Sequence, residues 1–196
     1  MTVLEQPAES RRAGPVHLPG DTSMWVFVLG DLVIFGVYFI VFMVYRTQEP
    51  AAYLSSQQHL SVAIGAVNTL VLLTSSQFVA LGVQAARAAQ HSRASRLLAL
   101  GGLCGGLFVL IKAYEWYDEA SRGYTLSYSD FFSYYYVFTG THLLHVFLGL
   151  GILGVVLREL RTDGQRRIWV VEAGATFWHM VDLLWVLLFA LLYVMR

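Results

Sequence analysis

The chain has 196 residues, of which 57% are hydrophobic and 13% are charged. Its mean hydropathy of +0.57 is far from that of an average soluble domain, which argues against a soluble globular protein. The 13 basic and 13 acidic side chains give no formal net charge at pH 7, so bulk charge indicates no nucleic acid or other polyanionic partner. We therefore expect an integral membrane protein.

The apolar residues gather in five runs, each long enough to cross ~30 Å of hydrocarbon as a helix of ~20 residues. In chain order the runs are 24–45, 61–86, 96–117, 131–157 and 169–195. The sequence thus predicts an all-α bundle of five transmembrane helices over 24–196, joined by short loops that include 47–60. Residues 1–23 lack the apolar core and the cleavage site of a signal peptide, and we expect a disordered cytoplasmic tail there.

The arginines predict the orientation of the helices. With the N-terminus in the cytoplasm, nine arginines fall on the cytoplasmic side and three fall outside, as the positive-inside rule requires. The nine are Arg11, Arg12, Arg87, Arg93, Arg96, Arg158, Arg161, Arg166 and Arg167. We expect a cytoplasmic N-terminus and a periplasmic C-terminus.

The first run carries Asp31 about seven residues from its start, roughly 10 Å below the cytoplasmic boundary. Two interpretations stay open for this carboxylate. It either bonds to a neighbouring helix for packing, or it is a proton-titratable group or a contact at the proton entry of a partner.

The second and third runs are rich in residues that hold helices together. The second carries hydroxyl and amide side chains about its middle, and four glycines in the third, Gly101, Gly102, Gly105 and Gly106, allow close backbone approach. The sole cysteine, Cys104, excludes an internal disulfide. Lys112 and Glu115 are spaced for ion pairing near the outer membrane interface, with pairing of Glu115 to His142 or to another group in the bundle as the alternative.

The last two runs contain five ionisable groups. His142 and His145 are neighbours on one helix face, and Glu172, His179 and Asp182 share a face because they lie within ~80° around the helix. Each ionisable group costs at least ~2.5 kcal/mol at bilayer depth, so we expect these faces to meet protein or water. Three intramembrane histidines are too few for the ~6 ligands of a haem-copper centre, although one bis-histidine haem remains an alternative.

Five motifs follow one another as in subunit III of the haem-copper oxidases, and the chain resembles that family over nearly all of 19–196. They read LGDLVIF at 29–35, NTLVLL at 68–73, YEWY at 114–117, TGTHLLHV at 139–146, and EAGATFWHMVDLLW at 172–185. The chain is similar to the five-helix form of the family. The Pro19-Gly20-Asp21 entry and the Gly30-Asp31 pair look most like the NorE-like branch associated with nitric oxide reductases.

The resemblance implies a non-catalytic accessory subunit in the bacterial inner membrane. Such a subunit binds no haem or metal itself, packs against a catalytic haem-bearing subunit that also holds copper or non-haem iron, binds phospholipid and supports proton delivery. Asp31, which replaces the family's usual Glu, would lie near the cytoplasmic entrance of the partner's proton-uptake pathway. The remaining groups would form an interhelical polar network: Glu115, His142, His145, Glu172, His179 and Asp182.

Two other functions fit the same residues. A small quinol-oxidising cytochrome b would hold haem between His179 and His142 or His145. A proton-conducting protein acting without partners would use Asp31, Glu172 and Asp182 as a relay. The sequence alone leaves the electron acceptor, oxygen or nitric oxide, undetermined.

Overall fold

The computed structural model describes residues 22–161 and 167–195. Within these ranges all regular secondary structure is helical, and there is no strand. The expected disordered tail falls almost wholly on residues 1–21, outside the described part. The helices are α1 (Thr22–Gln48), α2 (Pro50–Gln57), α3 (Val62–Arg87), α4 (His91–Ser121), α5 (Asp130–Arg161) and α6 (Ile168–Phe189), which continues as a π-helical turn, η1 (Ala190–Val194).

Five of these helices are long and apolar enough to cross a membrane, which confirms the predicted number of spans. The prediction of a loop at 47–60 is wrong, because α2 occupies most of this segment. Pro50 starts this eight-residue helix, where the missing backbone N–H and the fixed φ angle of proline are tolerated. Because α2 is only ~12 Å long, it cannot span the bilayer.

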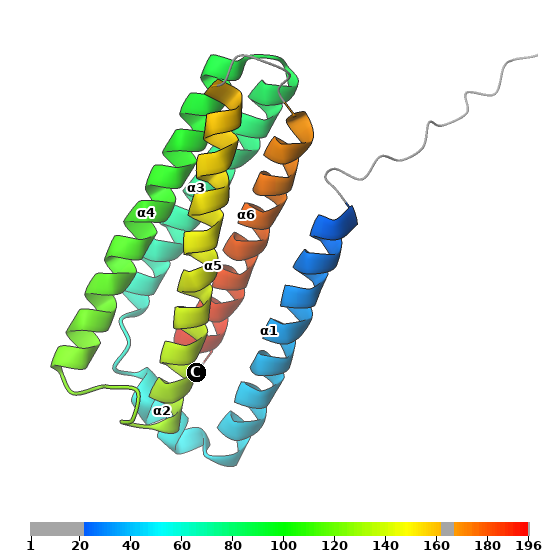
Figure 1. The fold of residues 1–196 in the computed structure, drawn as a ribbon. Helices are drawn as coiled ribbons and strands as arrows, with labels where there is room; N and C mark the ends of the chain where they lie inside the picture. Colours follow the sequence, from blue (N-terminus) through cyan, green and yellow to red (C-terminus); the bar gives the residue numbers. More distant parts are fainter. Residues whose placement is uncertain (1–21, 162–166, 196) are drawn as a thin grey trace, which may run out of the picture.

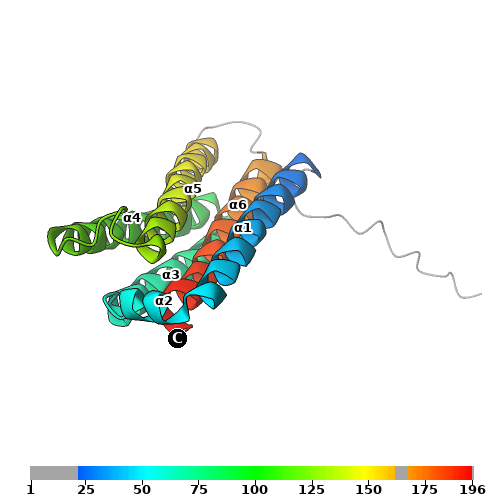
Figure 2. The ribbon, with the colours of Figure 1, turned by 90° about the horizontal axis from the view of Figure 1, so that it is seen from below.

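The helices form an up-and-down bundle in which α6 is central. The start of α1, the α3–α4 turn and the start of α6 lie at the same end, the top of Figure 1, while η1 lies at the other end. We call the top the arginine-rich end, because it carries Arg87, Arg93, Arg96, Arg158, Arg161 and Arg167. In the most apolar stretch of each span, 61% of the residues of α6 are buried against 17% for α1. Helix α1 therefore lies at the edge of the bundle, next to α6 and away from α4 (Figure 2).

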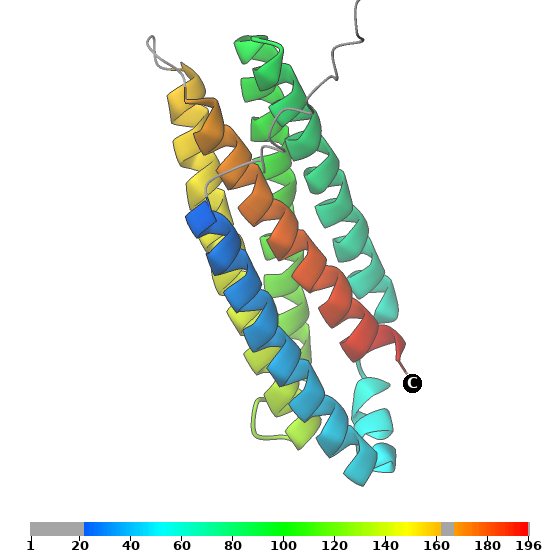
Figure 3. The ribbon, with the colours of Figure 1, turned by 90° about the vertical axis from the view of Figure 1, so that its right-hand side faces the viewer.

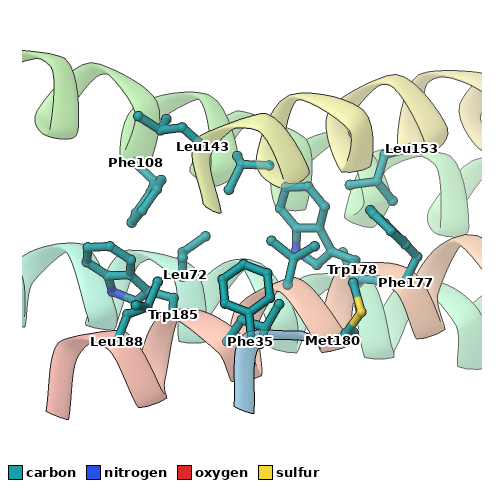
Figure 4. Packing of buried hydrophobic residues seen from close by; sticks show 14 of the residues in the cluster. Phe35, Leu72, Phe108, Leu143, Leu153, Phe177, Trp178, Met180, Trp185 and Leu188 are labelled. Carbon is teal, nitrogen blue, oxygen red and sulfur yellow. The ribbon is translucent and has the colours of Figure 1, made fainter. Parts of the chain in front are cut away.

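The centre of the core is the indole of Trp178 in α6 (Figure 4), which is fully buried. A Cβ at Gly105 of α4 would lie 2.5 Å from this ring, and one at Gly149 of α5 would lie 2.8 Å from it. The indole therefore fits only because both helices present glycine to it. Of the four glycines predicted to pack, Gly101 and Gly105 face neighbouring helices, whereas a Cβ added at Gly102 or Gly106 would meet no atom within 4 Å.

Helix α1 and the short α2 attach through aromatic side chains. Figure 3 shows α1 running in front of α5 beside α6. Phe42 of α1 is completely buried and its ring contacts Tyr53 of α2 and Phe131 and Phe138 of α5. Gln57 of α2 donates a hydrogen bond to the Leu192 carbonyl at 3.0 Å, so α2 is also tied to η1.

Candidate functional site

The polar groups that the sequence places at bilayer depth lie in several separate groups along the bundle. The first is built around Lys112 of α4, nearer the end of the bundle opposite the arginine-rich end. Its ammonium group donates to Glu115 Oε2 at 3.1 Å, to Tyr135 OH of α5 at 3.0 Å and to Tyr193 OH of η1 at 2.7 Å. All three of its N–H donors are thereby used.

This lysine cluster is internally satisfied. Tyr193 OH donates to the second Glu115 oxygen at 2.5 Å, and the side chains of Lys112 and Glu115 are 0% and 1% exposed. The predicted pairing of Lys112 with Glu115 is therefore present, and both side chains are buried inside the bundle. A buried pair with complete hydrogen bonding joins three helices and has no free polar atom left for chemistry.

The second group joins α1 to α5. Asp31 Oδ2 approaches His145 Nε2 to 3.3 Å, and both side chains are about 15% exposed. The Nδ1 atom of His145 lies 2.8 Å from the Thr141 carbonyl oxygen, which can only accept, so we assign the proton of the neutral imidazole to Nδ1. Asp31 Oδ2 is buried and has no hydrogen-bond partner among the described residues, so the 3.3 Å approach to His145 is a close contact and not a hydrogen bond.

The third group lies where α6 meets α3. Arg87 Nε donates to Glu172 Oε1 at 2.9 Å near the arginine-rich end. Deeper in the bundle, His179 Nδ1 lies 2.8 Å from Ser76 Oγ. Glu172 and His179 thus both bond to α3, as residues on a shared helix face can.

Asp182 is the least satisfied of the predicted residues. Its side chain is buried, and its Oδ2 lies 3.9 Å from His179 Nδ1, beyond hydrogen-bond distance. Neither of its carboxylate oxygens has a hydrogen-bond partner among the described residues.

His142 stands apart from the other histidines. It is fully buried, with ring centroids 5.6 Å from Phe108 and 5.3 Å from Trp185, and neither ring nitrogen is hydrogen bonded within the described part of the chain. Glu115 bonds to Lys112 and Tyr193, so the alternative pairing of Glu115 with His142 is not the one observed. The predicted residues therefore fall into separate local groups.

Residues from several helices complete these groups, and most of them were not predicted to do so. Tyr135, Tyr193 and Arg87 lie at helix ends, where aromatic and basic side chains are ordinary, so the sequence offers no local signal for their partners. Ser75 was noted only as a packing residue; it donates to the Gly101 carbonyl and accepts from the Trp178 indole.

Among the described residues, no group of three or more His, Cys, Asp or Glu side chains is placed to hold a metal ion. The three intramembrane imidazoles also have different neighbours, namely Asp31, the Phe108 and Trp185 rings, and Ser76.

These features define a polytopic helical membrane protein whose intramembrane ionisable groups lie in separate local groups, two of which contain the ion pairs Lys112–Glu115 and Arg87–Glu172. Residues 21–196 match the sequence model of the family described as cytochrome c oxidase subunit III. The chain belongs to this family of the haem-copper oxidases, as its motifs predicted.

Curated relatives agree with the family. The chain is 30% identical over 173 residues to cytochrome c oxidase subunit 3 of Synechocystis, covering 87% of this chain and 73% of the relative. It is 28% identical to cytochrome c oxidase subunit 3 of Corynebacterium diphtheriae, and the match covers 95% of this chain and 94% of the relative. It is also 29% identical over 186 residues to a protein of Aeropyrum pernix named heme-copper oxidase subunit I+III, of which it spans 22%.

Proposed function

We propose that the chain is a non-catalytic accessory subunit of a respiratory haem-copper complex. It binds the catalytic, haem-bearing subunit in the membrane, stabilises it, and carries no haem or copper of its own. The observation that carries this proposal is the match to subunit III over residues 21–196. The relative from Aeropyrum pernix, whose name combines subunits I and III in one chain, supports direct contact between the two.

A role in proton delivery is supported by the Asp31–His145 pair. Asp31 lies on α1, the helix least buried within this chain, at a position nine residues after Thr22. A carboxylate within 3.3 Å of an imidazole, on a helix at the edge of the bundle, is placed where it can exchange a proton with an adjoining subunit. With the N-terminus in the cytoplasm and the C-terminus in the periplasm, this pair would lie on the cytoplasmic half of the membrane.

Phospholipid binding is supported by an apolar groove along α1. This groove has a volume of about 350 Å³ and is lined by Phe39, Ile40, Met43, Val44 and Thr47. Its long, open and almost wholly apolar lining suits an acyl chain. The bacterial origin of these relatives supports a location in the bacterial inner membrane.

The electron acceptor of the complex is oxygen or nitric oxide. The names of the curated relatives favour oxygen, whereas Gly30-Asp31 and the resemblance to NorE-like proteins favour nitric oxide. Rates of oxygen and nitric oxide consumption by the purified complex separate the two.

The accessory role is tested by purification of the tagged chain in mild detergent from its native membranes. The expected result is co-elution of a larger, haem-bearing subunit that has a Soret band. Elution of the chain with no haem protein, from membranes that contain the oxidase, would refute the proposal.

A further inference from the structure

A groove between α3 and α6 differs from the lipid-facing side of α4. It holds about 230 Å³ and is lined by Ala80, Gln84 and Arg87 of α3 and by Thr176 and His179 of α6, among others. It starts near the arginine-rich end and runs toward the middle of the bundle. We call it the α3/α6 groove.

His179 places a polar atom on this surface at mid-membrane depth. It lies eleven residues after Ile168, ~16 Å along α6 and about halfway through a hydrocarbon core of ~30 Å. Its side chain is 39% exposed; Ser76 occupies Nδ1, and Nε2 has no hydrogen-bond partner among the described residues. An acyl chain can offer Nε2 no partner, and an unsatisfied polar group in hydrocarbon costs several kcal/mol.

Helix α4 shows what a lipid-facing surface of this protein looks like. Its exposed side chains at comparable depth are all leucines, with exposed fractions of 43 to 69%. They are Leu100, Leu103, Leu107 and Leu110. The polar lining of the α3/α6 groove therefore requires another explanation.

The shape and charge of the groove suit a helix. Ala80, Ala175 and Thr176 are small, and small residues let a second helix approach closely in a membrane. Arg87 and Glu172 neutralise each other at the arginine-rich end, so the groove does not call for a charged ligand.

We propose that the α3/α6 groove docks a transmembrane helix of the catalytic subunit, and that this helix carries a hydrogen-bonding side chain at the depth of His179. The proposal rests on the proposed function, because it assumes that the catalytic subunit is the partner. Beyond the accessory role, it names the face of this chain that the partner covers, and it names His179 as the residue that sets the depth of the docked helix.

Site-specific photo-crosslinking in native membranes tests the docking face. Benzoylphenylalanine is introduced in place of Thr176, or in place of Leu100 as the control at matched depth on α4. The Thr176 probe is expected to form an adduct with the catalytic subunit, and the Leu100 probe to form adducts with lipid only. Adducts of the Thr176 probe with lipid alone, or with a second copy of this chain, would overturn the proposal.

Affinity measurements on the assembled complex supply a second test that does not depend on a bulky probe. His179→Leu removes the proposed hydrogen bond and is expected to weaken retention of the catalytic subunit about three- to tenfold in a detergent titration. His179→Gln, which keeps a donor and an acceptor, is expected to retain most of the binding. Equal retention by all three proteins would overturn the role of His179.

The two proposals fail in different ways. If no catalytic subunit accompanies the unmodified chain, the accessory role fails. If the catalytic subunit does accompany it but crosslinks from another face, only the docking site fails.

Discussion

Gly105→Ala tests the packing at the centre of the bundle. The new methyl group would lie 2.5 Å from Cη2 and 2.8 Å from Cζ2 of Trp178. The indole cannot move away easily, because Gly149 lies against its other edge and its Nε1 donates to Ser75 at 3.1 Å. Overpacking of this kind costs ~1 to 3 kcal/mol, a ~5- to 150-fold change in the folded-to-unfolded ratio.

The assay is reversible unfolding in mixed micelles of mild detergent and SDS, followed by tryptophan fluorescence. Gly106→Ala is the matched control, since its Cβ would meet nothing within 4 Å. We expect this control to keep or raise the free energy of unfolding, by up to ~1 kcal/mol, because alanine favours a helix more than glycine does. Equal midpoints for Gly105→Ala and the unmodified chain would refute the close packing of Trp178 between two glycines.

Three further predictions concern the polar groups. Lys112→Met should destabilise the chain by ~3 to 5 kcal/mol in the same unfolding assay, because it leaves Glu115 as a buried charge. Adding Glu115→Gln should recover part of this loss, and no recovery would contradict the pairing. Asp31→Asn should leave the yield of complex unchanged and slow its turnover, and an unaltered rate from pH 6 to 9 would count against proton delivery. Trp178→Phe should cost ~1 kcal/mol or more through the lost bond to Ser75, and full stability would show that this bond is dispensable.

The spans could be predicted from the sequence because hydropathy over ~20 residues depends on composition and not on partners. Their ends could not, since α4 begins at His91, five residues before the predicted start at 96. The polar first turn of α4 extends beyond the apolar run. Helix α2 was missed because its eight residues are too few and too polar to form an apolar run, and its contacts with Phe42, Phe131 and Leu192 come from distant parts of the chain.

The candidate site, too, could be predicted only in part from the sequence. Sequence spacing correctly places Glu115 one turn after Lys112, and it places Glu172 and His179 on one face. It cannot show that Tyr193, 81 residues after Lys112, supplies the shortest bond to that ammonium group. Local periodicity gives the depth and face of a side chain, whereas its partner depends on how the helices pack.

The most direct test of the account is haem and metal analysis of the chain after stronger detergent has separated it from the purified complex. We predict that the separated chain has no Soret band and no bound iron or copper, while the catalytic subunit keeps both its haem and its absorbance. Stoichiometric haem on the separated chain, lost on substitution of His142, His145 or His179, would contradict the account.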